Sequence, residues 1–206
     1  MRSLDYGSRI FVALLALTSA CLGPARSARA TVVQTVSFDA QCATADRIFV
    51  GAVRAVESRR NAARPRYFET LVTFGVEEVV DGSVPPVLEL RFTGGRVGDV
   101  VQSIDGMPEF AVGERYVVFA DVNGEPPLVS PIVGFNQGLY RVVREESGGG
   151  LRDLVRDRVG APLADSKAAY GSAVVPGAGP SGGPGTVAAE PELDAFLAAI
   201  RAARRR

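Results

Sequence analysis

Histidine is absent from all 206 residues of this chain. The absence removes the side chain that most often acts as a general base near neutral pH, and it removes the commonest zinc ligand. Every Ser-His-Asp and Cys-His catalytic arrangement is excluded with it. We therefore expect no metal, no cofactor and no enzymatic activity.

Other missing motifs narrow the remaining enzyme classes. The sequence has no paired-cysteine motif, no Walker loop and no dinucleotide fingerprint, and no helix pattern follows the glycine run at residues 148–150. Ser166 and Lys167 are adjacent rather than at helical spacing. Glu77 and Glu78 are neighbours on an expected strand and point to opposite faces, so they cannot act on one bond. A hydrolase that uses carboxylates from separate strands is the catalytic alternative.

The chain also lacks an excess of either charge, with 23 basic and 23 acidic residues. Without residues 1–30, which have the features of a leader, 19 basic and 22 acidic residues remain. This balance leaves no excess of positive charge of the kind that binds nucleic acid. A hydrophobic fraction of 47% excludes disorder throughout the chain, and the length fits one domain.

Residues 1–30 are organised like a secretory signal peptide. Basic residues precede the apolar run at residues 10–17, which is too short to span a bilayer as a helix. A small-x-small pattern ends at Ala30, so we expect cleavage between Ala30 and Thr31. The mature protein is then periplasmic or extracellular.

A lipoprotein signal is the alternative interpretation of the same segment. Residues 17–21 resemble a degenerate lipobox that ends at Cys21, with Thr18 where leucine is usual. Acylation of Cys21 would tether the same domain to a membrane surface. Contact with a membrane is expected in this case alone.

Cleavage after Ala30 leaves Cys42 as the single cysteine, so an internal disulfide is excluded. Ser37 is placed as the N-cap of a short helix on which Phe38 and Cys42 share a face. We expect Cys42 to be a small buried hydrophobic residue. The alternative is a reactive thiol or an intermolecular disulfide, which needs exposure and a low pKa.

Alternating polarity between residues 48 and 143 predicts an antiparallel sheet. Residues 48–56 are apolar on both faces, with Gly51 at a bend. In residues 68–77, inward apolar side chains alternate with outward polar ones such as Glu69. Further strands are expected at residues 88–93, 97–104, 116–120 and 138–143.

The spacing of these strands, without long helices between them, predicts a mainly β fold. We expect a small antiparallel OB-like barrel over residues 31–160, with a short N-terminal helix. Glycine and proline are frequent in residues 161–190, which are expected to be a flexible linker. Residues 191–206, with Pro191 in the first turn, predict a separate amphipathic helix that docks on the barrel. A helix that binds a membrane surface or a partner is the alternative.

Several short motifs together resemble a group of exported, uncharacterised bacterial proteins, over about residues 31–143. They are rich in glycine and alternating apolar residues and lie at residues 45–53, 76–82, 94–98, 106–110, 113–119 and 134–138. The strand after Ala45-Asp46 and the Gly-x-x-Tyr-x-x-Phe strand are also similar to the netrin-like domain of tissue inhibitors of metalloproteinases. That resemblance implies an OB-type barrel. Those inhibitors chelate zinc through a free N-terminal cysteine, which a chain beginning at Thr31 lacks, so no residue role carries over.

The glycine-rich segment between residues 94 and 113 is the candidate site. The glycines expected to serve turns and bulges are Gly94, Gly95, Gly98, Gly113 and Gly138. The functional interpretation is a binding loop on the rim of the barrel that carries Arg96 and Asp99. We expect an exported, non-catalytic binding module whose partner is an extracytoplasmic protein. A lipid-anchored envelope protein is the alternative.

Overall fold

The structure is a computed structural model that describes residues 35–123, 129–147, 150–158, 160, 163 and 190–206. All of them fall within one compact unit, Val33–Arg206. The expected leader, with Cys21, Ala30 and Thr31, lies outside the described residues, as does nearly all of the expected linker. Among the helices of the described part, none combines the length and apolar character needed to cross a membrane.

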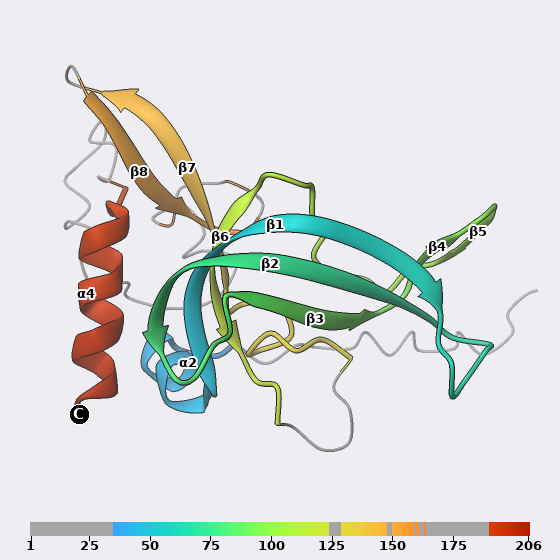
Figure 1. Ribbon diagram of the computed structural model, residues 1–206. Coiled ribbons are helices and arrows are strands. Elements are labelled where there is room, and N and C mark those ends of the chain that lie inside the picture. The colour runs from blue at the N-terminus through green and yellow to red at the C-terminus, as the bar shows by residue number, and fades with distance from the viewer. Residues whose placement is uncertain (1–34, 124–128, 148–149, 159, 161–162, 164–189) are drawn as a thin grey trace, which may run out of the picture. The chain divides into compact units, whose positions relative to one another are not determined.

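The main sheet has six strands. They are β1 (Arg47–Arg60), β2 (Phe68–Asp81), β3 (Val87–Thr93), β6 (Arg115–Ala120), β7 (Leu139–Ser147) and β8 (Gly150–Arg156). Every neighbouring pair is antiparallel, in the order β3-β2-β1-β6-β7-β8 (Figure 1). The expected mainly β, antiparallel fold is confirmed. Within the described residues no pairing joins the end strands β3 and β8, so closure into a barrel stays a prediction.

The central strands β1 and β6 are covered on both faces. Ile48 and Val50 belong to one apolar cluster, whereas Phe49 belongs to another. Successive side chains of a strand point to opposite faces, so the two clusters lie on opposite faces of the sheet. This confirms the prediction for the first part of β1. The pairing with β2 shifts register between Val50 and Gly51, where the bend was expected.

We name the two clusters by what covers them. The helix-side cluster includes Phe38, Cys42, Ile48, Val50, Val117, Phe119, Tyr140, Val142, Val155, Phe196, Leu197 and Ile200. The loop-side cluster includes Phe49, Val53, Val72, Phe74, Leu88, Leu90, Phe92, Tyr116, Val118, Ile132 and Leu139.

Helix α2 (Phe38–Thr44) forms where the sequence predicts it. The Ser37 hydroxyl accepts a hydrogen bond from the Ala40 N–H at 3.2 Å, which satisfies one of the free N–H groups at the start of the helix. Phe38 and Cys42 share the buried face of the helix. The capping residue and the apolar face are thus both confirmed.

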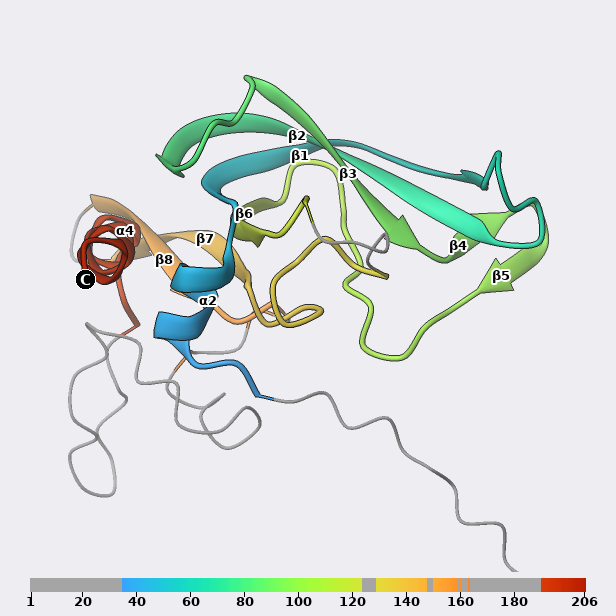
Figure 2. The ribbon, with the colours of Figure 1, turned by 90° about the horizontal axis from the view of Figure 1, so that it is seen from below.

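Helix α4 (Leu193–Arg204) packs beside α2 on the helix-side cluster (Figure 2). The ring of Phe196 is fully buried, 5.6 Å from the ring of Phe38 and 4.9 Å from that of Tyr140, measured between centroids. Burial of this stripe confirms that the helix docks. The helix lies in the same compact unit as the sheet.

The start of α4 differs from the prediction. Pro191 precedes the helix instead of lying in its first turn, and Glu192 is the N-cap. The Val155 N–H donates to the Pro191 carbonyl at 2.9 Å, and Glu192 forms a bridge to Leu154. These contacts with β8 hold the residues before the helix in an extended conformation.

The prediction that Glu69 faces solvent is wrong, because this residue on β2 is only 3% exposed. Its carboxylate accepts hydrogen bonds from Arg59 at 2.8 Å and from Asn61 at 2.6 Å, and Arg91 lies 3.5 Å away. The bond from Arg59, above all, lowers the pKa of Glu69. Pairing with arginine therefore allows a charged side chain to be buried at a position of β2 that the alternating pattern assigns to the outward face.

The prediction of a single strand at residues 97–104 is also wrong. Two short strands, β4 (Gly95–Val97) and β5 (Val100–Gln102), pair with each other in a hairpin. Gly98 between them has a φ of +60°, which lets the chain reverse within the segment.

Strand β8 is absent from the sequence prediction. It pairs with β7 in an antiparallel ladder and buries Val155, and charged side chains add further contacts. Asp153 accepts hydrogen bonds from Arg144 at 2.8 Å and from Arg115 at 2.7 Å. These bonds, that from Arg144 first, lower the pKa of Asp153 to about 2.

Candidate functional site

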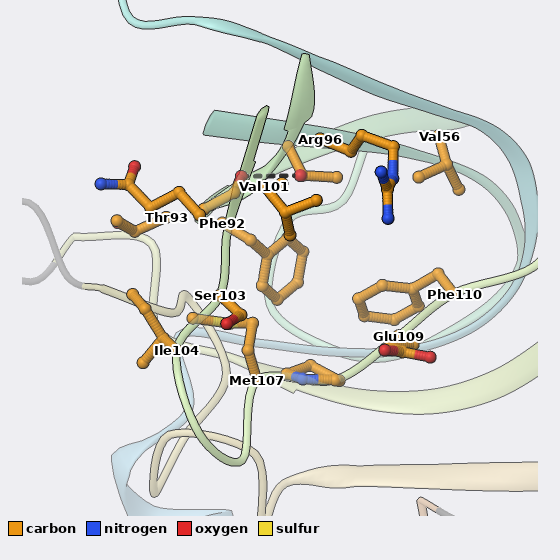
Figure 3. A pocket seen from close by; sticks show the side chains of 15 residues that line it. Val56, Phe92, Thr93, Arg96, Val101, Ser103, Ile104, Met107, Glu109 and Phe110 are labelled. Carbon is orange, nitrogen blue, oxygen red and sulfur yellow. Dashed lines mark hydrogen bonds between the residues drawn. The ribbon is translucent and has the colours of Figure 1, made fainter. Parts of the chain in front are cut away.

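The segment that joins β3 to β6, together with residues of β1, β2 and β3, lines an open cavity of about 410 Å³ (Figure 3). We call it the hairpin cavity, because the β4–β5 hairpin forms one wall and the loop of residues 103–114 forms another. The apolar side chains that line it are Val56, Phe92, Val101, Ile104, Met107, Pro108 and Phe110. Its volume lies at the lower end of the range of small-molecule sites, roughly 300–1,000 Å³.

Hydrogen bonds to β2 fix the hairpin wall. The Phe68 N–H donates to Gln102 Oε1 at 2.7 Å, and the Thr70 hydroxyl donates to the Gly94 carbonyl at 2.8 Å. The Thr70 and Ser58 hydroxyls lie 2.9 Å apart. The residue before β4 and the last residue of β5 are therefore held by the main sheet.

Phe110 fixes the loop wall. Its half-buried ring packs on the loop-side cluster, with centroid distances of 5.0 Å to Phe92, 5.6 Å to Tyr116 and 5.8 Å to Phe74. Such edge and tilted contacts between rings favour one arrangement of the loop. The carbonyl of Gly106 in the same loop accepts a hydrogen bond from the side chain of Asn136.

Two opposite charges lie on the hairpin cavity. Arg96 directs its guanidinium group into the cavity from β4, and the carboxylate of Glu109 lies on the other side of the Phe110 ring (Figure 3). Both side chains are exposed, and neither makes an ion pair or hydrogen bond within the described part of the chain. Asp99 lies in the hairpin turn and does not line the cavity. The structure thus separates the two residues proposed for one binding loop.

The expected role of the glycines holds for four of the five positions. The φ angles are +101° at Gly94, +133° at Gly95, +60° at Gly98 and +91° at Gly113. Gly138 has no positive φ. A Cβ atom at residue 138 would lie 2.9 Å from the Cβ atom of Phe119, so close packing against β6 explains this glycine.

A second cavity of about 520 Å³, the loop cavity, shares residues 107–110 with the first. Glu109 and Glu114 both line it, together with Tyr116 and Arg141. The Glu114 carboxylate accepts hydrogen bonds from the Tyr116 hydroxyl at 2.5 Å and the Ala111 N–H at 3.1 Å, and it pairs with Arg141. Burial, and then the bond to Glu114, raises the pKa of Tyr116. Glu114 therefore ties the loop to β6 and β7.

Cys42 is not a reactive thiol. It is 1% exposed, and burial, followed by the charge of Asp39, raises its pKa to about 11. The expectation of a small buried hydrophobic residue is confirmed, and the alternative of a reactive cysteine is wrong.

Metal ligands do not gather in the described part of the chain. No group of three or more histidine, cysteine, aspartate or glutamate side chains there could hold a metal ion. The hairpin cavity contains a single carboxylate, that of Glu109, and a single guanidinium group, that of Arg96. Its chemistry is that of an apolar site with one charge of each sign.

Sequence reasoning missed Phe110, Met107 and Glu109 as site residues. Residues 106–110 stood out only as one motif of a resemblance, and nothing in their spacing indicates that they face β3 and the hairpin. The side chains meet through tertiary packing.

No protein-family model, curated protein or solved structure matches the chain. The function therefore has to be argued from the geometry of the cavities.

Proposed function

We propose that this chain is an exported, non-catalytic binding module whose ligand occupies the hairpin cavity. The observation that carries the proposal is an anchored, aromatic-walled cavity with two charged side chains, Arg96 and Glu109, that have no partner within the described residues. Apolar walls with a few convergent polar groups are the usual composition of ligand sites.

The residues around the hairpin cavity favour binding over catalysis. General acid–base chemistry on one bond ordinarily uses two proton-transferring groups. The hairpin cavity has one carboxylate and, in a chain without histidine, no imidazole. Both walls are held by hydrogen bonds or ring contacts, so a ligand would meet a largely preformed site.

A carboxylate-dependent hydrolase is the second candidate, and the loop cavity is the observation in its favour. Glu109 and Glu114 line that cavity together. The oxygens of Glu114, however, are already used by Tyr116, Arg141 and the Ala111 N–H. Loss of a hydrolytic activity in Glu114→Gln, with the fold intact, would favour this candidate.

Amide NMR during a screen of small ligands tests the binding proposal. Chemical-shift changes should be confined to residues 92–110 and their neighbours on the cavity wall, and the ligand should be recovered unchanged. Shift changes on α4 alone, or conversion of the ligand, would contradict the proposal.

Export and anchoring are a separate part of the proposal, supported by the pattern of residues 1–30. Mass spectrometry of the mature N-terminus distinguishes the two forms. A free Thr31 supports a periplasmic or extracellular protein, and an acylated Cys21 supports the lipid-anchored alternative. An intact Met1 would contradict both.

The OB-like, netrin-like barrel is likewise proposed, on the motifs that carry the resemblance. The sheet order and the strand bulges are compatible with a curved sheet. An experimental structure in which the two end strands meet would establish closure.

A further inference from the structure

The polar groups around the hairpin cavity divide into those that hold the wall and those that face a ligand. Gln102, Thr70 and the Gly94 backbone are used in bonds between the hairpin and β2. The side chains of Arg96, Ser103 and Glu109 make no hydrogen bond within the described residues. A cation, a hydroxyl group and a carboxylate are therefore available to one ligand.

We propose, resting on the binding function above, that the hairpin cavity takes the free C-terminal end of a peptide whose last side chain is apolar. Arg96 binds the terminal carboxylate through paired N–H donors. The last side chain packs among Phe92, Val101 and Phe110. Glu109 accepts hydrogen bonds from N–H groups of the same peptide.

The position of Glu109 favours a peptide over a simple fatty acid. A fatty acid has a carboxylate for Arg96 and an apolar chain for the walls, but no donor for Glu109. An apolar chain packed against Glu109 would displace water from its carboxylate and supply no hydrogen bond in return, which is unfavourable. A peptide satisfies both charges, because its carboxylate and its N–H groups have opposite hydrogen-bonding roles.

The size of the cavity favours a peptide end over a long segment. Its volume of about 410 Å³ is small for a binding site, and the hairpin and the loop bound it on two sides. Figure 3 shows Arg96 and Glu109 on different sides of the Phe110 ring, so a short ligand across that ring meets both charges. Charge complementarity thus fixes the direction of the peptide, with its carboxylate toward β4.

Titration calorimetry with the full chain tests this assignment. The probes are the tripeptide Ala-Ala-Leu, the same tripeptide as its C-terminal amide, and octanoate. We expect the amide to bind about tenfold more weakly than the free acid, because it loses the charge-assisted contact with Arg96. Octanoate should bind more weakly than the free acid, and Glu109→Gln, which removes the unpaired carboxylate, should strengthen its binding.

Three variants assign the contacts. Arg96→Gln should weaken the free acid by about tenfold and leave the amide unchanged, since the amide has no carboxylate to lose. Glu109→Gln should weaken both peptides. Arg206→Gln removes the same charge from an exposed position outside the cavity and should change neither affinity.

The assignment is overturned if the amide matches the acid, if Arg96→Gln keeps full affinity, or if octanoate binds best. In those cases the binding function is still supported if another ligand in the NMR screen shifts the amide signals of residues 92–110. If no ligand shifts those signals, the binding function fails as well.

Discussion

The ring of Phe110 lies 5.0 Å from the ring of Phe92, measured between centroids, although one belongs to a loop and the other to the end strand β3. Both rings line the hairpin cavity. This contact joins the loop wall to the main sheet, so the cavity depends on a pair of residues 18 positions apart in the sequence.

Phe110→Ala should therefore destabilise the fold and loosen the loop. The ring is half-buried, so we expect a loss of about 2 kcal/mol in the free energy of unfolding, less than for a fully buried phenylalanine. Denaturant unfolding measures the loss. Val112→Ala, at an exposed position of the same loop, should change the stability by less than about 0.5 kcal/mol. Equal effects of the two variants would contradict the role of the ring.

Gly95→Ala should disrupt the anchoring of the hairpin. The residue has a φ of +133°, and an added Cβ atom would lie 2.5 Å from the Ser58 hydroxyl oxygen and closer still to that of Thr70. We expect a loss of about 2–3 kcal/mol in the free energy of unfolding.

Gly98→Ala is the matched control in the hairpin turn. Its φ is +60° and no heavy atom lies within 4 Å of the added Cβ atom, so only backbone strain of about 1 kcal/mol is expected. Denaturant unfolding compares the two variants. A larger loss at Gly98 would show that packing against β2 does not fix the hairpin.

Phe196→Ala tests whether α4 belongs to the core. The ring is fully buried between those of Phe38 and Tyr140, so its removal should lower the free energy of unfolding by about 3–5 kcal/mol. Arg205→Ala, at the exposed end of the helix, should have little effect. A stability unchanged by Phe196→Ala would mean that the helix is dispensable for folding.

Asp153 should make stability depend on pH in the acid range. Its pKa is about 2 in the folded protein and ordinarily 3.8, because Arg144 and Arg115 stabilise the ionised form. Between these two pKa values the folded protein binds fewer protons than the unfolded chain. The contribution of Asp153 to the free energy of unfolding is therefore complete above about pH 4 and is lost as the pH falls toward 2. The side chain is partly exposed, so we expect a contribution of about 1–2 kcal/mol.

Asp153→Asn should accordingly be less stable than the wild type at pH 7, with a difference that shrinks between pH 4 and pH 2. Urea unfolding across this range measures the difference. Asp99→Asn, in the exposed hairpin turn, is the control and should show no such trend. A difference that stays constant down to pH 2 would contradict the ion-pair assignment.

The sequence predicts those elements whose side chains follow a simple apolar period. β1, β2, β3 and β6 alternate apolar and polar residues or are apolar throughout, and α2 and α4 carry apolar stripes. Strand β8 and buried Glu69 escape the same analysis, because ion pairs with arginines on other strands of the sheet contribute to their placement. Such pairs depend on register, which a single strand pattern does not contain.

The candidate site is only partly predictable for a related reason. Glycine spacing and exposed charge draw attention to Arg96 and Asp99 alike, yet the turn at Gly98 places one on the cavity and the other beyond it. Phe110 and Glu109 enter the site through contacts with strands distant in the sequence. The position of the segment is predictable, but the cavity inside it is not.

The most direct test of the hairpin cavity as a binding site is to take a ligand found in the NMR screen and to measure by calorimetry its affinity for two tryptophan variants. Val101 lines the cavity, whereas Val100, its neighbour on β5, is equally open to solvent but does not line it. Val101→Trp should fill the cavity and weaken binding by about tenfold or more, while Val100→Trp keeps the wild-type affinity. Equal affinities in the two variants would contradict the account.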